Sequence, residues 1–312
     1  MKIQYSDQKK VFNLHTEQIP YLSVDLLDRL GVPNLYSTRF RSFDAQRGEG
    51  EEGLRVVVMN HEDLAEAAPV VFENRDKLAH QLGSSIGHES ITDQTHTNRV
   101  YVVTPEDLGP ILRTEKPAHR RDIDGLVTDI PEVLLTAFGG DCPPVYIADP
   151  VRKTIGLVHA GWKGTLGKIP AEAIRLMSER FGSDPQDLYT AIGPGICVDC
   201  YEMGDEVYDQ FSNQWGRSAA DRIFRRYPSG KYHLDLREAN RMTLLEAGVR
   251  ADRIAVSNVC TMCNADVFYS YRAHRMQNEQ TAMIVNRFGE KTMPSAPNTV
   301  IRPKHSQRSK KC

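Results

Sequence analysis

The residues best suited to chemistry are a cysteine and a histidine that flank two apolar runs. Cys142 precedes the first run, 145–148, and His159 follows the second, 154–158. The polar residues between the runs are typical of a β-hairpin turn. With the turn centred just after Pro150, we expect Cys142 and His159 to lie opposite each other at the open end, with Cβ atoms roughly 4.5–5.5 Å apart. A thiol and an imidazole at that separation can share a proton or a metal ion.

A glycine-rich turn follows that histidine. Gly161, Gly164 and Gly167 come before a run at 170–182 that starts with proline, ends with glycine and has apolar residues at helical spacing. This pattern predicts a helix. Backbone N–H groups at such a turn, together with Lys163, suit a phosphate or another anion. The spacing matches neither the dinucleotide-binding glycine pattern nor the P-loop, so a plain strand-to-helix turn is the alternative.

Composition excludes several classes of protein. The chain has 312 residues, 40% of them apolar, and a net charge of −2. Residues 291–312 carry six basic residues and no acidic one, so the rest of the chain is acidic, which argues against a nucleic-acid binder. The first residues lack the apolar stretch of a secretory signal, and no apolar run is long enough to span a membrane. We therefore expect a cytoplasmic protein with reduced thiols, a monomer or weak homo-oligomer, and no membrane partner.

The order of predicted elements indicates the fold class. Strand-like and helix-like patterns follow one another without strict alternation, and a further amphipathic helix is expected at 69–83. No linker divides residues 1–290. We expect one α/β (α+β) domain over this range, with a mixed β-sheet flanked by helices. Residues 291–312 read as a basic, disordered tail, and deletion from about Ser295 to Cys312 should leave stability and activity nearly unchanged.

Two further residues are ordinary when taken alone. His96 lies in a polar turn that enters a predicted strand, and a single histidine at such a place is more often a surface residue than a ligand. Arg39 lies in a short β-like segment and places a cation in the amino-terminal part of the chain.

Two CxxC pairs raise the question of a second metal. By spacing alone, Cys197-x-x-Cys200 and Cys260-x-x-Cys263 suggest a structural zinc bound by four thiolates. The gap between the pairs is wide for a zinc ribbon, and strands and helices of an ordinary core fill it. We therefore favour buried free thiols. On that interpretation, replacing Cys197 and Cys263 by serine leaves the metal content intact.

Several motifs together resemble one known family. They are Tyr36-Ser-Thr-Arg39, Gln94-x-His96, Gly140-Asp141-Cys142, His159-Ala-Gly-Trp-Lys-Gly164, Ile192-Gly193-Pro194 with Cys200-Tyr201-Glu202, Cys260-Thr261 and Phe268-Tyr-Ser-Tyr-Arg272. They resemble the YfiH/YlmD family over roughly residues 30–287. That family was named for multicopper polyphenol oxidase or laccase domains and has since been described as purine nucleoside phosphorylase and adenosine deaminase. Some bacterial members are called peptidoglycan editing factors.

The resemblance implies a single α/β domain of the kind shared with cysteine-hydrolase-like toxins. It also implies that His96, Cys142 and His159 form the metal-binding or catalytic triad. Thr97 and Gly140 stand where the family commonly has glycine and alanine. Both are neighbours of ligands, so these departures bear on substrate fit.

Two histidines and a cysteine suit Zn²⁺ and leave a fourth position for water or substrate. Such a site can activate water for attack on C6 of adenosine, which is deamination. Copper would accept the same ligands. A multicopper oxidase needs many histidines, however, and this chain has ten and no His-x-His pair. We therefore reject laccase chemistry.

The implied second activity is phosphorolysis of purine nucleosides: adenosine, inosine and methylthioadenosine. It needs a bound phosphate and a proton donor for the departing purine. Candidates for holding substrate and phosphate are Arg39, Lys163, Gly161 and Arg272, and Asp141 or a histidine could donate the proton.

Two other interpretations stay open. With Cys142 as nucleophile, His159 as base and His96 as orienting group, the same residues would form a cysteine amidase that edits cell-wall precursors. A zinc-stapled binding module built on the CxxC pairs and the basic tail would have no catalytic activity.

Overall fold

The central strands are apolar on both faces, which predicts a sheet that is covered on both sides. The computed structural model describes residues 1–42, 53–58, 63–275 and 278–289, and it bears this out. In β8 (Pro144–Asp149), Val145 and Ile147 pack toward helices, whereas Tyr146 and Ala148 belong to the core between two sheets. Alternate side chains of one strand therefore hold two different layers together.

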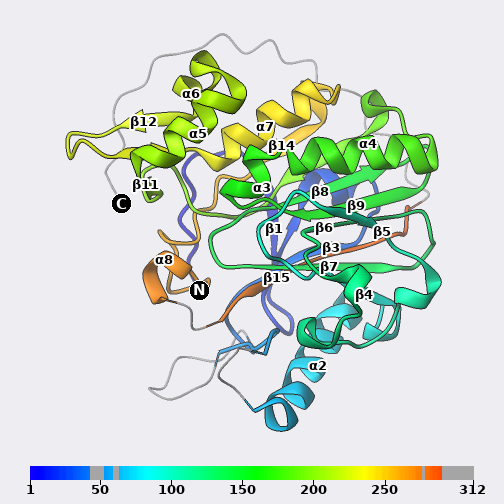
Figure 1. Cartoon of the computed structure of the whole chain (residues 1–312). Coiled ribbons are helices and arrows are strands. Elements are labelled where there is room, and N and C mark those ends of the chain that lie inside the picture. Colours follow the sequence, from blue (N-terminus) through cyan, green and yellow to red (C-terminus); the bar gives the residue numbers. More distant parts are fainter. Residues whose placement is uncertain (43–52, 59–62, 276–277, 290–312) are drawn as a thin grey trace.

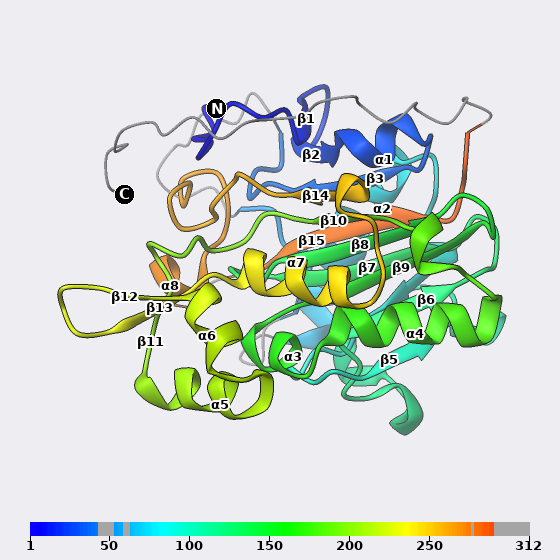
Figure 2. The same ribbon diagram turned by 90° about the horizontal axis from the view of Figure 1, so that it is seen from above.

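Four layers result, in the order helices, sheet, sheet, helix (Figures 1 and 2). The first sheet has the order β1-β2-β3-β15-β7-β4 and the second the order β14-β10-β8-β9-β6-β5. Both sheets are mixed, because β4 pairs with β7, β5 with β6, and β14 with β10 in parallel, while the remaining pairs are antiparallel. The predicted α/β class with a mixed sheet flanked by helices is confirmed, and the mixed sheet is present as two stacked sheets.

The strands of the first sheet are β1 (Phe12–His15), β2 (Tyr21–Val24), β3 (Asn34–Ser37), β4 (Glu89–Ile91), β7 (Leu134–Gly139) and β15 (Gln280–Val285). Those of the second sheet, besides β8, are β5 (Val100–Val102), β6 (Gly125–Thr128), β9 (Thr154–His159), β10 (Tyr189–Ile192) and β14 (Ile254–Val256). A small third sheet joins β11 (Glu202–Met203), β12 (Phe224–Arg226) and β13 (Tyr232–Leu234).

The helices are α1 (Asp25–Arg29), α2 (Leu64–Gln81), α3 (Trp162–Leu166), α4 (Ile169–Phe181), α5 (Asp205–Trp215), α6 (Arg217–Ile223), α7 (Leu236–Glu246) and α8 (Tyr271–His274). Helices α4 and α7 cover the second sheet, and α2 covers the first (Figure 1). No helix in the described part of the chain is both long and apolar enough to cross a membrane.

Local signals located the two helices predicted above, one of them with an error of extent. The helix predicted at 170–182 is α4, which ends where Gly182 adopts the left-handed conformation. The helix expected to begin at Pro69 begins earlier, because Asp63 caps it by accepting the N–H groups of Ala65 and Glu66, and Pro69 lies inside it. The tail expected at 291–312 lies outside the described residues.

The predicted register of the central hairpin was wrong by two residues. Strands β8 and β9 pair with Pro144 opposite His159. The Asp149 side chain accepts the N–H groups of Val151 (2.8 Å) and Arg152 (3.0 Å), which places the turn one residue later than expected. Since an even shift leaves every side chain on the same face, Cys142 stays on the His159 side of the hairpin.

Candidate active site

Two loops and the end of strand β9, at one end of the second sheet, bring together the predicted triad. His159 ends β9, Cys142 lies in the loop between β7 and β8, and His96 lies between β4 and β5. Their potential ligand atoms all lie within 4.8 Å of one another. The two imidazole rings meet edge to face, with centroids 5.0 Å apart and planes inclined by 78°. His159 is buried, Cys142 is half-buried and His96 is exposed, so the group opens to solvent on the His96 side.

Gly161 forms the floor of this group. A Cβ atom built on Gly161 would lie 2.9 Å from His96 Cδ2, 3.0 Å from Cys142 Sγ and 3.5 Å from His159 Cε1. Only a residue without a side chain leaves room for these three groups to converge. The position predicted as a phosphate contact thus contributes space to the triad, and the glycine turn forms the short helix α3.

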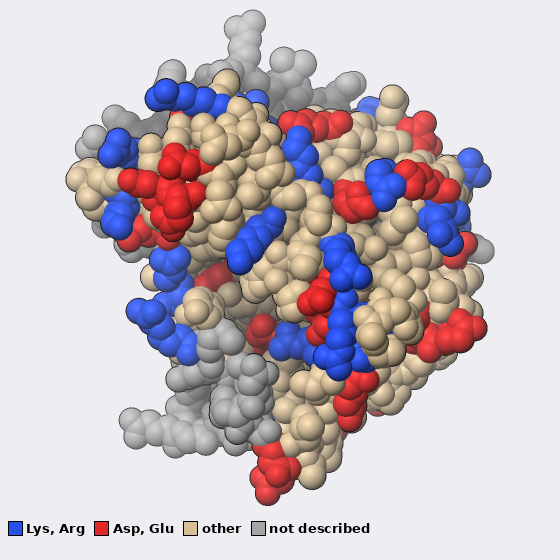
Figure 3. Space-filling model, viewed as in Figure 1, with Lys and Arg blue, Asp and Glu red and all other residues tan. Residues whose placement is uncertain are grey.

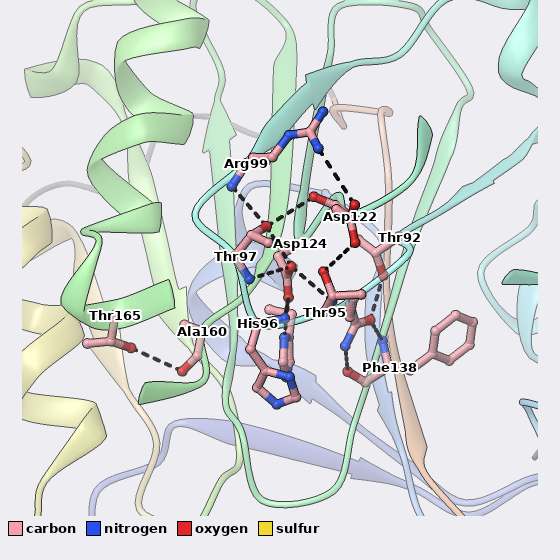
Figure 4. Close-up of polar contacts among 12 residues, drawn as sticks. Thr92, Thr95, His96, Thr97, Arg99, Asp122, Asp124, Phe138, Ala160 and Thr165 are labelled. Atoms are coloured by element: carbon pink, nitrogen blue, oxygen red, sulfur yellow. Dashed lines mark hydrogen bonds and ion pairs between the residues drawn. The ribbon is translucent and has the colours of Figure 1, made fainter. Parts of the chain in front are cut away.

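Asp124, which the sequence arguments did not single out, organises two of the three residues (Figure 4). Its Oδ1 accepts from His159 Nδ1 (2.8 Å) and from the backbone N–H of His96 (3.1 Å). Its Oδ2 accepts from the N–H groups of Thr95 (3.2 Å) and Thr97 (2.8 Å) and from the Thr97 hydroxyl (2.8 Å). With Nδ1 so occupied, His159 has Nε2 left for a metal or a proton. The carboxylate also supports His96 in its left-handed conformation, with φ 66°.

The same contacts shift three pKa values. Burial alone would raise the pKa of Asp124, but hydrogen bonds from His159 and Thr97 lower it. Burial would lower the pKa of His159, yet the adjacent Cys142 thiolate and the Asp124 hydrogen bond raise it to about 10. Burial would also raise the pKa of Cys142, whereas the charge of His159 and hydrogen bonds from both histidines lower it to about 7. Without a metal, these shifts favour a thiolate beside an imidazolium.

Asp141 holds a loop in place. Its carboxylate accepts from Thr261 Oγ1 (2.5 Å), from Ser270 Oγ (3.0 Å) and from the backbone N–H of Arg272 (2.8 Å). Burial raises its pKa, and these three hydrogen bonds oppose the rise. Both oxygens are engaged with the protein, so the structure places Asp141 as support for the residue that follows it, Cys142.

A cavity of about 500 Å³ lies over the triad. The described residues that line it are Gln94, His96, Arg113, Gly139, Gly140, Asp141, Cys142, His159, Trp162, Lys163, Tyr201, Met203, Tyr271, Arg272, Asn278 and Glu279. Aromatic and basic side chains thus line the same cavity as the thiol and the two imidazoles. Acidic and basic side chains are interspersed around the hollow that is visible on this face (Figure 3).

The structure separates the predicted anion-binding residues into two groups. Lys163 and Arg272 line the cavity, and Arg272 also donates to the Glu202 carbonyl at 3.0 Å. Arg39 is not among the described residues that line it. Instead, Arg39 Nη1 donates to the Ala265 carbonyl (2.9 Å) and contacts His274 Nε2 (3.2 Å), with its guanidinium over the Tyr269 ring. Arg39 therefore supports the 265–274 segment that carries Arg272.

The donor set fits a single transition-metal ion such as zinc. Two imidazole nitrogens and a thiol of lowered pKa converge, and a carboxylate fixes the second nitrogen of one imidazole, as is usual around bound zinc. The residues that would hold the ion are His96, Cys142 and His159, and three protein ligands would leave a fourth position for water or substrate.

Comparison with known proteins gives one consistent result. The family described as multi-copper polyphenol oxidoreductase laccase matches residues 58–287. The purine nucleoside phosphorylase YlmD of Bacillus subtilis is 35% identical over 221 residues, which cover 71% of this chain and 77% of that protein. The adenosine deaminase RL5 of an unknown prokaryotic organism is 35% identical over 202 residues, 65% of this chain and 76% of that protein.

A solved structure agrees with the sequence comparisons. The crystal structure of the Bacillus licheniformis hypothetical protein YfiH matches with a TM-score of 0.77 and 31% identity, covering 89% of this chain and 99% of that one. This chain therefore belongs to the YfiH family, the one described as multi-copper polyphenol oxidoreductase laccase.

Proposed function

We propose that this chain is a purine nucleoside phosphorylase, acting on adenosine, inosine and methylthioadenosine, that also deaminates adenosine at a zinc ion held by His96, Cys142 and His159. One observation carries the proposal: the triad opens into a cavity that is also lined by three basic side chains (Arg113, Lys163 and Arg272) and several aromatic ones. The relatives named purine nucleoside phosphorylase and adenosine deaminase support it. Copper accepts the same ligands, so metal analysis of the purified protein is part of the test.

In phosphorolysis, a phosphate oxygen bonds to C1′ of the ribose while the bond from C1′ to the purine nitrogen breaks. The electron pair leaves with the base, which takes up a proton. Lys163 and Arg272 are the lining cations that would hold the phosphate, and Trp162, Tyr201 and Tyr271 offer faces for the sugar and base. Asp141 is assigned to hold the loop, because both its oxygens already accept hydrogen bonds.

Zinc, when bound, supplies a Lewis acid that activates water for deamination at C6. The chain's own contribution is geometric. Asp124 keeps His159 Nδ1 protonated and oriented, Gly161 keeps the floor open, and the buried side of the triad excludes water.

The test is incubation of the zinc-loaded protein with adenosine, inosine and methylthioadenosine, with and without phosphate. Free base and the corresponding sugar 1-phosphate (ribose 1-phosphate, or 5-methylthioribose 1-phosphate from methylthioadenosine) should appear only with phosphate, and inosine should form from adenosine without it. Cys142→Ala should abolish both reactions. Folded, zinc-loaded protein that yields no product under any of these conditions would refute the proposal.

Two lysine substitutions, one inside the cavity and one outside it, test the proposed phosphate site. Lys163→Ala should raise the KM for phosphate about ten- to a hundred-fold, because a charge-assisted hydrogen bond contributes about 1.5–3 kcal/mol. Lys168→Ala removes a nearby lysine that pairs with Glu246 and does not line the cavity, and it should leave this KM unchanged.

A cysteine amidase is the second candidate, favoured by the Cys142–His159–Asp124 order of thiolate, imidazolium and carboxylate. It predicts cleavage of an amide in a cell-wall peptide precursor by metal-free protein, with a transient acyl group on Cys142 that mass spectrometry detects. Activity that requires zinc and leaves no acyl adduct counts against it.

A further inference from the structure

A second cluster of sulfur atoms lies outside the candidate active site. The Sγ atoms of Cys197, Cys200, Cys260 and Cys263 all lie within 4.8 Å of one another. Cys263 Sγ is 3.5 Å from that of Cys200 and 3.9 Å from that of Cys197. A zinc ion with four Zn–S bonds of about 2.3 Å has sulfur atoms about 3.75 Å apart along the edges of its tetrahedron. The two sulfur–sulfur distances given above lie on either side of that value.

The fold explains how pairs so far apart in sequence meet. Strands β10 and β14 are parallel neighbours, and each CxxC turn follows the carboxyl end of one of them. A bridge between Gly195 and Cys260 continues the pairing beyond the strands. The intervening chain, which includes α5, α6 and α7, is one crossover between the two parallel strands. The sequence-based preference for buried or partly buried free thiols stays a prediction, but the structure brings the two pairs together despite the wide gap between them in sequence.

Backbone donors surround one of the sulfurs as in a metal-thiolate turn. Cys260 Sγ accepts from the N–H of Cys197 (3.2 Å) and from the N–H of Cys263 (3.4 Å). Each pair thus donates to the same sulfur. Two N–H groups directed at one sulfur favour its thiolate form, which is the form that binds metal.

We propose that Cys197, Cys200, Cys260 and Cys263 bind a structural zinc ion, separate from the ion proposed at the triad. Four sulfur ligands form a closed tetrahedral site, with no position left for substrate. Cys263 is disulfide-bonded in the structure, so the proposal concerns the reduced protein, in which this sulfur is a thiolate. This site goes beyond the proposed function and does not depend on it.

The proposed ion would hold together the two CxxC turns, and both turns contact the loop that contains Asp141 and Cys142. Ile196, just before the first pair, donates its N–H to the Asp141 carbonyl (2.8 Å), and Thr261, inside the second pair, donates to the Asp141 carboxylate (2.5 Å). Asp141 immediately precedes Cys142. Metal that joins the two turns would therefore fix the position of the active-site thiol.

The experiment counts and characterises zinc in protein that is expressed with added zinc and purified with a reductant and no chelator. Wild-type protein should contain two zinc ions per chain by elemental analysis. Cys142→Ser should lose one, and X-ray absorption at the zinc edge of that variant should show four sulfur neighbours at about 2.3 Å and no imidazole nitrogen. Cys260→Ser should also retain one zinc, bound mainly by nitrogen and oxygen with a single sulfur, and should unfold at a lower temperature.

The outcomes separate this proposal from the proposed function. One zinc in wild-type protein that survives in Cys142→Ser with four sulfur neighbours supports the structural site and refutes the triad zinc. A Cys142→Ser variant that is folded but free of zinc overturns the structural site, as does iron in place of zinc. A disulfide that takes Cys263 out of the ligand set in reduced protein, seen by peptide mapping, also overturns it. The Cys142→Ser readout does not depend on the folding of Cys260→Ser.

Discussion

At the scale of single residues, Asp124 decides the geometry of the site. It is fully buried, and its two oxygens accept five hydrogen bonds, one from the His159 ring and the others from the segment 95–97. A carboxylate suits this cluster of donors because, when ionised, it only accepts hydrogen bonds and has no proton that would repel them. Thr97, which departs from the family pattern, contributes two of these donors.

Asp124→Asn should weaken zinc binding at the triad about 10- to 100-fold, because the amide carries no charge and places an NH₂ group against donors. The measurement is competition with a zinc chelator, with Asp122→Asn as control. Asp122 is a neighbouring exposed carboxylate that contacts Thr95 and Arg99 and does not touch His159. Equal zinc affinity in both variants would contradict the role given to Asp124.

Gly161→Ala should also reduce zinc binding and activity, with little loss of thermal stability. The added methyl would lie 2.9–3.0 Å from His96 and Cys142, closer than side-chain atoms normally approach. Gly87→Ala, at an exposed glycine whose nearest neighbour would be Ser85 Oγ at 3.4 Å, is the matched control. Full zinc occupancy in Gly161→Ala would show that the floor of the triad can move.

At the scale of elements, the segment 104–121 packs against the edge strand β4, and several of its charged side chains are buried there. Lys116 is only 2% exposed and donates its ammonium group to the carbonyl of Ile91, the last residue of β4. Burial, with a contribution from Arg120, lowers the pKa of Lys116 to about 7. A strand edge is therefore capped by a lysine that is near its titration point at neutral pH.

This predicts a pH-dependent stability. In the unfolded chain, lysine keeps its proton up to about pH 10.4. Between pH 7 and that value the unfolded state binds one more proton than the folded state, so the free energy of unfolding should rise with pH by up to about 1.4 kcal/mol per unit. Below pH 7 both states are protonated and this contribution is constant.

Lys116→Met removes the titrating group while nearly conserving volume. The difference in unfolding free energy, wild type minus variant, should increase from pH 7 to pH 9 and be flat below pH 7, as measured by urea unfolding. Parallel stability curves for the two proteins across this range would exclude the lowered pKa. Lys168→Met, which changes a partly exposed lysine, should give such parallel curves.

At the scale of the whole molecule, the four layers are built entirely from residues that precede residue 291. The last strand, β15, lies between β3 and β7, and Gly289 donates its N–H to the Gly31 carbonyl. Each apolar face of the two sheets is covered by the other sheet or by helices that precede this point.

Deletion of residues 291–312 should therefore leave the melting temperature and the proposed nucleoside activity nearly unchanged. The comparison needs only thermal unfolding and steady-state kinetics of the two chain lengths. A large drop in either would mean that these residues dock on the described part of the chain.

The sequence by itself determined much of the local structure and the types of residue available for catalysis or metal binding. Helix α4 was predictable from its proline, its terminal glycine and its apolar spacing, since these act within a few turns. The residue types of the triad, the glycine turn and the charge of the chain could also be read directly. The family resemblance added His96, whose own surroundings in sequence gave no reason to choose it.

Only the tertiary structure decided which of these residues meet. Asp124 lies next to His159 because β6 and β9 are paired. Arg39 does not line the cavity, because its guanidinium binds the 265–274 segment. The CxxC pairs lie close together because β10 and β14 are parallel neighbours. Even the hairpin register depended on a side chain, because Asp149 accepts hydrogen bonds from two backbone N–H groups of the turn. Contacts between residues far apart in the chain depend on strand pairing and layer packing, which patterns of nearby residues do not specify.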